Sequence, residues 1–194
     1  MPGQDLPPLH HAVRATREHG YAYVPRALDQ HQCQRLVSSI PDSLAEPVEE
    51  VVGEVRQHAR ELALPVDGLD NLELNRLLAA FDKALPATVA FTPTELTYMF
   101  YKGPHAGISP HRDPARHKML IAIFTLKGRA TFRVHGTRSE SDITAEWTTS
   151  PGDLMFLRAP ELHPHIKARP FHSIGPPIGS EERISLSLRM KSSP

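Results

Sequence analysis

The sequence predicts a single α+β domain, residues 1–194, with a mainly β core: a helical layer over residues 1–94 covers a sandwich or barrel of strands over residues 95–190. With 194 residues and 40% hydrophobic content, the chain can bury one core but hardly two. The first half shows apolar residues at helical spacing, and from about residue 95 the segments become short, β-branched and aromatic. Helices with one apolar face need a surface to cover, so we expect two layers of one domain.

Four helices and a short strand are expected in the first half. The helix over 10–20 ends at Gly20, a short strand covers 21–28, and Asp29 is a suitable N-cap for the helix over 30–40. Valines at amphipathic spacing favour a third helix over 46–64, and leucines favour a fourth over 71–85. In the second half at least five strands are expected, over 94–103, 118–128, 130–136, 153–159 and 183–190.

Composition narrows the function classes. The net charge is zero, which does not favour a dedicated nucleic-acid binder. The charge is unevenly distributed, because residues 1–95 hold 8 basic and 14 acidic residues whereas residues 96–194 hold 14 basic and 8 acidic residues. Cys33 is the only cysteine, so no intramolecular disulfide forms, and we interpret it as a packing residue on a helix. The N-terminus lacks a signal-peptide pattern, and no apolar run approaches the ~18–20 residues of a membrane span. We therefore expect a cytoplasmic protein with a small-molecule substrate and no membrane partner.

The triplet His111-Arg112-Asp113 precedes a long apolar strand. Residues i and i+2 of an extended chain project to the same face, so the imidazole and the carboxylate can converge on one point. His172, at the start of an expected strand, is the favoured third partner. His163 and His165 stay as rivals for that place, although they flank Pro164 in an expected loop. Two histidines and one carboxylate form the facial triad of non-haem Fe(II) oxygenases, which leaves adjacent coordination sites open.

Arg183 and Ser185 alternate on the last expected strand and share a face. The guanidinium fork of an arginine pairs with a carboxylate better than a lysine does. The set His111, Asp113, His172, Arg183 and Ser185 resembles the H-x-D … H … R-x-S pattern of the Fe(II)/2-oxoglutarate-dependent dioxygenases, over roughly residues 95–190. The resemblance implies a double-stranded β-helix, a cupin-like jelly roll with N-terminal helices packed on one sheet. It also implies Fe(II), 2-oxoglutarate and O2 as cofactor and cosubstrates.

The segment "RISLSLR" also resembles the last core strand of the AlkB-type branch, R-x-N-L-T-x-R, with Arg189 as its second arginine. That branch carries a cosubstrate-binding tyrosine upstream of the H-x-D, and Tyr101 occupies a comparable place. Ser185 replaces the asparagine, and Met99-Phe100-Tyr101 replaces Asn-x-Tyr. The resemblance thus supports a cosubstrate pocket rather than a repair function. For Arg189, a second carboxylate contact and an ordinary surface arginine stay open.

The resemblance implies hydroxylation of a C–H bond with release of succinate and CO2, because halogenating relatives lack a carboxylate at the position of Asp113. A small amino-acid-like or natural-product substrate is favoured. AlkB-like oxidation of a nucleobase or nucleotide and a non-catalytic metal-binding cupin stay as alternatives. His105 and His117 bracket the H-x-D and could contact the substrate, but we favour an interpretation as surface histidines. We interpret His135 as solvated and Asp153 as fixing a turn.

Overall fold

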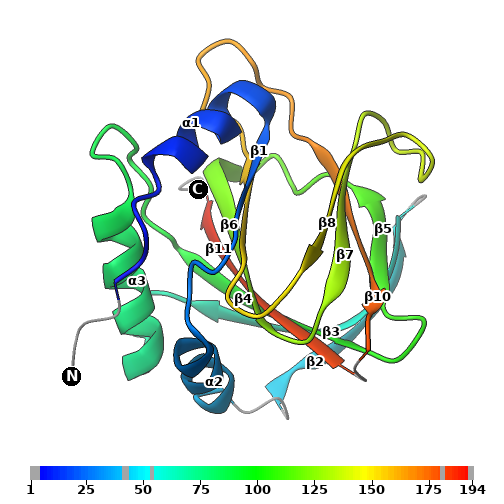
Figure 1. Cartoon of the computed structure of the whole chain (residues 1–194), viewed down its shortest axis with the longest axis horizontal. Helices are drawn as coiled ribbons and strands as arrows, with labels where there is room; N and C mark the ends of the chain where they lie inside the picture. The colour runs from blue at the N-terminus through cyan, green and yellow to red at the C-terminus, as the bar shows by residue number, and fades with distance from the viewer. Residues whose placement is uncertain (1–4, 41–43, 53–54, 180–181, 192–194) are drawn as a thin grey trace.

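The computed structural model describes residues 5–40, 44–52, 55–179 and 182–191. Within these ranges it contains three helices and eleven strands. The helices are α1 (His10–His19), α2 (Gln30–Ser38) and α3 (Leu72–Ala84). Figure 1 shows them on one side of a strongly curled sheet. The expected mainly β jelly roll with N-terminal helices on one face is confirmed.

The ends of the helices have local causes. Gly20 adopts φ +98° and closes α1, a conformation in which glycine has no Cβ penalty. Asp29 and Gln32 form a capping box at the start of α2, each side chain accepting a hydrogen bond from the other's backbone N–H. Asn71 accepts from the Leu74 N–H and caps α3. These three helices confirm the expectations for 10–20, 30–40 and 71–85.

All eleven strands pair antiparallel in one curled sheet, in the order β1-β9-β6-β11-β4-β3-β5-β10-β7-β8, with β2 paired to β3. Their bounds are β1 Tyr21–Val24, β2 Glu46–Val52, β3 Val55–Pro65, β4 Glu95–Lys102, β5 Gly107–His111, β6 His117–Lys127, β7 Ala130–His135, β8 Ile143–Thr149, β9 Leu154–Arg158, β10 Phe171–Pro177 and β11 Glu182–Lys191.

The helix expected over 46–64 is wrong: this segment forms the β2–β3 hairpin, so the helical N-terminal layer is interrupted by two strands. Its valines fit helical spacing, but β-branched side chains favour the pleated sheet. The decisive factor is tertiary, because β3 pairs with β4 from Arg60 opposite Phe100 to Pro65 opposite Glu95. The hairpin thereby becomes a wall of the barrel.

Apolar side chains bury on both faces of the curled sheet. The larger cluster lies between the helices and the sheet and includes Leu36, Phe81, Phe124 and Phe156, all at most 1% exposed. A smaller cluster, which includes Met99 and Phe132, lies on the concave face. The concave face therefore combines apolar walls with the polar residues of the candidate site. Within the described residues, no helix is long and apolar enough to span a membrane.

Candidate metal centre and active site

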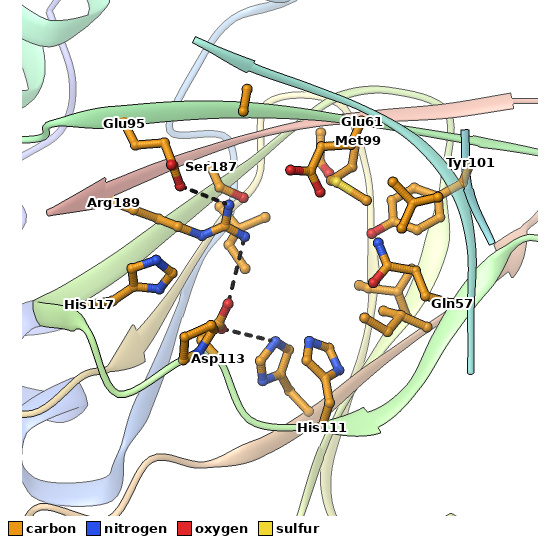
Figure 2. A pocket seen from close by; sticks show the side chains of 18 of the residues that line it. Gln57, Glu61, Glu95, Met99, Tyr101, His111, Asp113, His117, Ser187 and Arg189 are labelled. Atoms are coloured by element: carbon orange, nitrogen blue, oxygen red, sulfur yellow. Dashed lines mark ion pairs between the residues drawn. The ribbon is translucent and has the colours of Figure 1, made fainter. Parts of the chain in front are cut away.

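Two neighbouring strands bring His111, Asp113 and His172 together. His111 ends β5 and lies opposite His172 in the β5–β10 pairing, with the ring centroids 4.2 Å apart. Asp113 follows two residues after the strand, and its Oδ2 is 3.4 Å from His172 Nε2. Figure 2 shows His111 and Asp113 on the same side of the cavity. One potential ligand atom from each residue lies within 4.8 Å of the others. This spacing suits three ligands on one face of a metal ion.

Neighbouring groups orient the two imidazoles. The Nδ1 atom of His111 lies 2.9 Å from the carbonyl oxygen of Ser109, and this contact restrains the orientation of the ring. The ring of Phe132 stacks on His172 with centroids 5.7 Å apart and an interplanar angle of 7°. Arg169 donates to the backbone carbonyl of Asp113. These contacts restrain the two imidazole rings and the backbone at Asp113.

The site favours the protonation states that a metal requires. Burial lowers the pKa of His172 to about 3, assisted by the neighbouring His111, and burial also lowers the pKa of His111. Burial by itself would raise the pKa of Asp113, but His172 and Arg189 outweigh it and hold this pKa below its ordinary value. At neutral pH the site therefore offers two neutral imidazoles and one carboxylate, which can bind a divalent cation without first losing protons.

The rival histidines lie elsewhere. His165 is exposed and His163 half-buried, both in the loop between β9 and β10. The Nδ1 atom of His163 accepts hydrogen bonds from the backbone N–H groups of His165 and Ile166. His163 is thus engaged in local loop structure, and the geometry favours His172.

Arg183 provides a buried cation on the same concave face. It is 1% exposed, and its Nη2 donates to Thr125 Oγ1 at 3.1 Å. Its Nε and Nη1 have no hydrogen-bond partner within the described residues. Its guanidinium lies 5.4 Å from the centroid of the Tyr101 ring, its cross-strand neighbour, and Ser185 lies two residues along β11. Unsatisfied buried N–H groups are costly, so this arrangement suits an anionic ligand that accepts from them.

Arg189 is not an ordinary surface arginine. Its Nη2 lies 3.6 Å from Asp113 Oδ1, and its Nη1 lies 3.9 Å from Glu95 Oε1. Glu95 also pairs with Lys191. The arginine thus connects the candidate metal carboxylate to a second carboxylate, as Figure 2 shows. A contact with a cosubstrate carboxylate stays a prediction for this residue.

A cavity of about 620 Å³ joins these groups; its lining includes the triad, Tyr101, Arg183, Ser185 and Arg189. Several lining residues were missed from the sequence. The expectation of a surface histidine at 117 is wrong: His117 is 2% exposed, lines the cavity, and has no hydrogen-bond partner within the described residues for either ring nitrogen. Glu46, Gln57 and Glu61 also line the cavity, and the assignment of their segment to a helix concealed this.

Two further predictions from the sequence concern His135 and Asp153, which lie outside this cavity. His135 is 4% exposed rather than solvated, and its Nε2 lies 2.8 Å from Ser173 Oγ. Asp153 does fix a turn: its carboxylate accepts from the Ser150 N–H, the Arg26 N–H and the Tyr23 hydroxyl. The signal for Asp153 was local, whereas the burial of His135 depends on a neighbouring strand.

No protein-family model and no curated protein sequence matches the chain. Solved structures do match. A Pseudomonas putida prolyl-4-hydroxylase is 17% identical with a TM-score of 0.60, over 94% of this chain and 98% of that one. The non-heme alpha ketoglutarate dependent epimerase SnoN from nogalamycin biosynthesis is 18% identical with a TM-score of 0.65, over 94% and 83%. The fold is that of the 2-oxoglutarate-dependent oxygenases.

The structure of OsALKBH1 is a further match, at 12% identity and a TM-score of 0.58, over 88% of this chain and 98% of that one. Together these structures confirm the expected double-stranded β-helix. At such identities they establish the fold, and the chemistry has to be argued from the residues of this chain.

Proposed function

We propose that the chain is an Fe(II)- and 2-oxoglutarate-dependent oxygenase that hydroxylates a C–H bond of a small amino-acid-like or natural-product molecule. One observation carries the proposal. Three ligand atoms from His111, Asp113 and His172 lie within 4.8 Å of one another, and the same cavity is lined by Arg183, a buried arginine with two nitrogens unpartnered within the described residues. A metal site and a carboxylate site in one cavity match the two groups that this reaction requires.

The donor set fits Fe(II). Two imidazoles and one carboxylate are ligands of intermediate hardness, and a facial arrangement leaves room for a bidentate keto acid and dioxygen. When bound, Fe(II) with 2-oxoglutarate and O2 supplies the oxidising chemistry and releases succinate and CO2. The task of the protein is to bind, orient and exclude water. Arg189 restrains the carboxylate of Asp113, and Phe132 restrains the ring of His172.

The chain also offers a matched site for the cosubstrate. Arg183 would bind the carboxylate of 2-oxoglutarate that lies far from the metal, with Ser185 as a hydroxyl partner on the same strand face. Burial raises the pKa of Tyr101, so its phenol stays protonated and can donate a hydrogen bond. Arg189 is the candidate for the carboxylate beside the metal. These roles of Arg183, Ser185, Tyr101 and Arg189 are predictions.

The size of the cavity supports a small substrate. About 620 Å³ is within the usual range for small-molecule sites, and part of it would hold the cosubstrate. The neutral net charge supports the same conclusion. A second candidate, oxidation of a nucleobase or nucleotide, is favoured by one observation: Arg183 and Arg189 both reach this cavity from β11 at the spacing of the AlkB-type strand.

The deciding experiment measures succinate release from 2-oxoglutarate against a metabolite and nucleotide library. We expect release that requires both Fe(II) and 2-oxoglutarate and that the right substrate stimulates. Asp113→Ala should lower Fe(II) affinity at least ~10–100-fold, because a methyl group supplies no anionic ligand. His163→Ala is the matched control and should bind iron normally. Normal iron content in Asp113→Ala would overturn the triad, and metal binding without any 2-oxoglutarate turnover would favour a non-catalytic cupin.

A further inference from the structure

The β2–β3 hairpin separates its charges between two faces. Glu61 of β3 lines the cavity, whereas Arg56 and Arg60 of the same strand do not. Arg56 instead pairs with Glu140 at 2.9 Å, and Arg60 donates to the carbonyl of Ala45 at 2.9 Å. Side chains alternate between the two faces of a strand. The odd-numbered side chains of β3 therefore point toward the cavity, and the even-numbered ones, which include Arg56 and Arg60, point away from it. The wall that faces the cavity is therefore acidic.

A second carboxylate lies directly opposite the first. Glu46 of β2 is the cross-strand partner of Glu61, and both line the cavity. Residues in this relation have Cβ atoms only ~4.5–5.5 Å apart, and like charges there are destabilising. In the part of the chain that the structure describes, neither carboxylate has an ion pair or a hydrogen bond. Within the described residues, the hairpin thus keeps a like-charged pair that no direct ion pair offsets.

The other acidic residues of the cavity are already neutralised. Glu95 pairs with Lys191 and lies near Arg189, and Asp113 lies within 3.6 Å of Arg189. Arg183 lies beside Tyr101 and is assigned to the cosubstrate. Among the described residues, the exposed Glu46 and the half-buried Glu61 are therefore the carboxylates of this cavity that are left without an ion pair.

The cavity also contains buried polar groups that await a ligand. His117 is 2% exposed and lines the cavity, and both of its ring nitrogens lack a partner within the described residues. Figure 2 shows Glu61 directed into the cavity on the side opposite His111 and Asp113, with His117 at a third corner. A molecule between these walls would meet the metal centre on one side and the carboxylates on the other.

We infer that the substrate carries a positively charged nitrogen, an ammonium or a guanidinium, and that Glu61 and Glu46 bind it across the cavity from the triad. This inference rests on the proposed function and specifies its substrate class. The two carboxylates would hold the cationic end, so that a carbon along the molecule lies near the metal. Their mutual repulsion is relieved when the substrate is bound.

The first test measures binding rather than turnover. Protein loaded with redox-inactive Mn(II) and 2-oxoglutarate is titrated calorimetrically with paired probes of similar shape: L-lysine against L-norleucine, L-arginine against L-citrulline, and butylamine against butanol. We expect at least one cationic probe to bind roughly tenfold or more tightly than its neutral partner. Glu61→Gln and Glu46→Gln should each reduce this preference. Glu18→Gln, on the exposed face of α1, is the matched control and should retain it.

The second test needs no ligand. Removing one of two repelling carboxylates should raise the melting temperature of the metal-free protein by roughly 1–4 °C, in Glu61→Gln and in Glu46→Gln alike. A lower melting temperature in both variants would give the pair a structural role and overturn the inference. So would equal or absent binding of all cationic and neutral probes. A second equivalent of Mn(II), lost in the double variant, would assign the pair to a metal ion and overturn it as well.

The two proposals fail separately. Both glutamine variants should bind Fe(II) and 2-oxoglutarate as the unmodified chain does, since neither residue is among the candidate ligands. Normal binding of these two groups without any preference for cations would remove only the inference about the substrate. Loss of iron or 2-oxoglutarate binding from the unmodified chain would remove the proposed function.

Discussion

At the residue scale, burial decides what each polar side chain of the cavity can do. His172 is 4% exposed and stays neutral at physiological pH, so its nitrogen is free for a metal. Arg183 is 1% exposed, and two of its nitrogens have no partner within the described residues. Unpaired buried N–H groups lower the stability of the ligand-free protein, and a bound carboxylate would offset this loss. Sites of this kind sacrifice stability for binding.

Replacing Arg183 with methionine should weaken 2-oxoglutarate binding by ~2–5 kcal/mol, the usual cost of losing one partner of a buried charge pair. Calorimetry on the Mn(II)-loaded protein measures this change. Arg133→Met is the control, because Arg133 pairs with Glu146 on an exposed surface and should leave cosubstrate affinity unchanged. An unchanged dissociation constant in Arg183→Met would assign the carboxylate to Arg189 instead.

His117 should make the metal-free protein sensitive to acid. Burial lowers its pKa from 6.5 to about 4, so between these values the unfolded state binds more protons than the folded state. Stability is therefore complete above pH ~6.5 and falls as the pH decreases toward 4, by up to ~1.4 kcal/mol per pH unit from this residue. Urea unfolding at a series of pH values, with a chelator present, measures the slope.

His117→Gln should flatten that slope. It should not abolish it, because His172, whose pKa is lowered to about 3, contributes in the same direction. The lowered pKa of Asp113 also acts in this direction, but mainly below the ordinary carboxyl range. The same slope with glutamine at 117 would contradict the assignment.

At the element scale, the close approach of β5 and β10 sets the metal centre. Gly107 begins β5 with φ +151°, and a Cβ there would lie 2.5 Å from the carbonyl oxygen of Ile174 in β10. No other residue type fits this contact without moving the strands apart. Since His111 and His172 are paired across the same two strands, the spacing of the candidate ligands depends on this glycine.

Gly107→Ala should therefore lower both stability and metal affinity. We expect a loss of ~1–3 kcal/mol in the free energy of unfolding, from backbone strain and overpacking, together with weaker Mn(II) binding. Gly103→Ala is the matched control: it has φ +84° but no atom within 4 Å of a new Cβ. It should cost only the left-handed backbone penalty of ~1–2 kcal/mol and leave metal affinity unchanged. Equal metal affinity in both variants would contradict the role of Gly107.

At the scale of the whole molecule, the helices and the curled sheet form one buried layer behind the site. Cys33 of α2 is 1% exposed within this layer, and its Sγ lies 4.0 Å from the carbonyl oxygen of Thr125 in β6. The neighbouring Thr125 hydroxyl holds Arg183. Packing of α2 against β6 thus supports the strand that positions the candidate cosubstrate site.

Cys33 should react with thiol reagents only when the domain unfolds. Burial raises its pKa to about 11, so little thiolate forms at neutral pH, and the sulfur is covered. We expect the rate of reaction with a chromogenic disulfide to follow the unfolded fraction across a urea titration. Rapid reaction in native buffer would show that α2 opens independently of the sheet.

The candidate site was predictable where its signals were local. The H-x-D spacing, the two alternating residues Arg183 and Ser185, and the capping residue Asp29 are short patterns whose geometry follows from one strand or one helix end. His172 was selected over His163 and His165 because a strand start differs from a proline-containing loop. The structure brings His111, Asp113 and His172 together, and their role as metal ligands stays a prediction.

By itself the sequence determined strands β1, β4, β6, β7, β9 and β11, the Asp29 cap of α2 and which residue types could bind a metal and a carboxylate, because these depend on contacts within a few residues. Only the tertiary structure decided that Glu46–Val52 and Val55–Pro65 form paired strands, that His117 is buried, and that Glu46 and Glu61 line the same cavity. Each of these depends on pairing or packing between segments far apart in the chain. Burial and like-charge opposition are properties of that pairing, and no local pattern contains them.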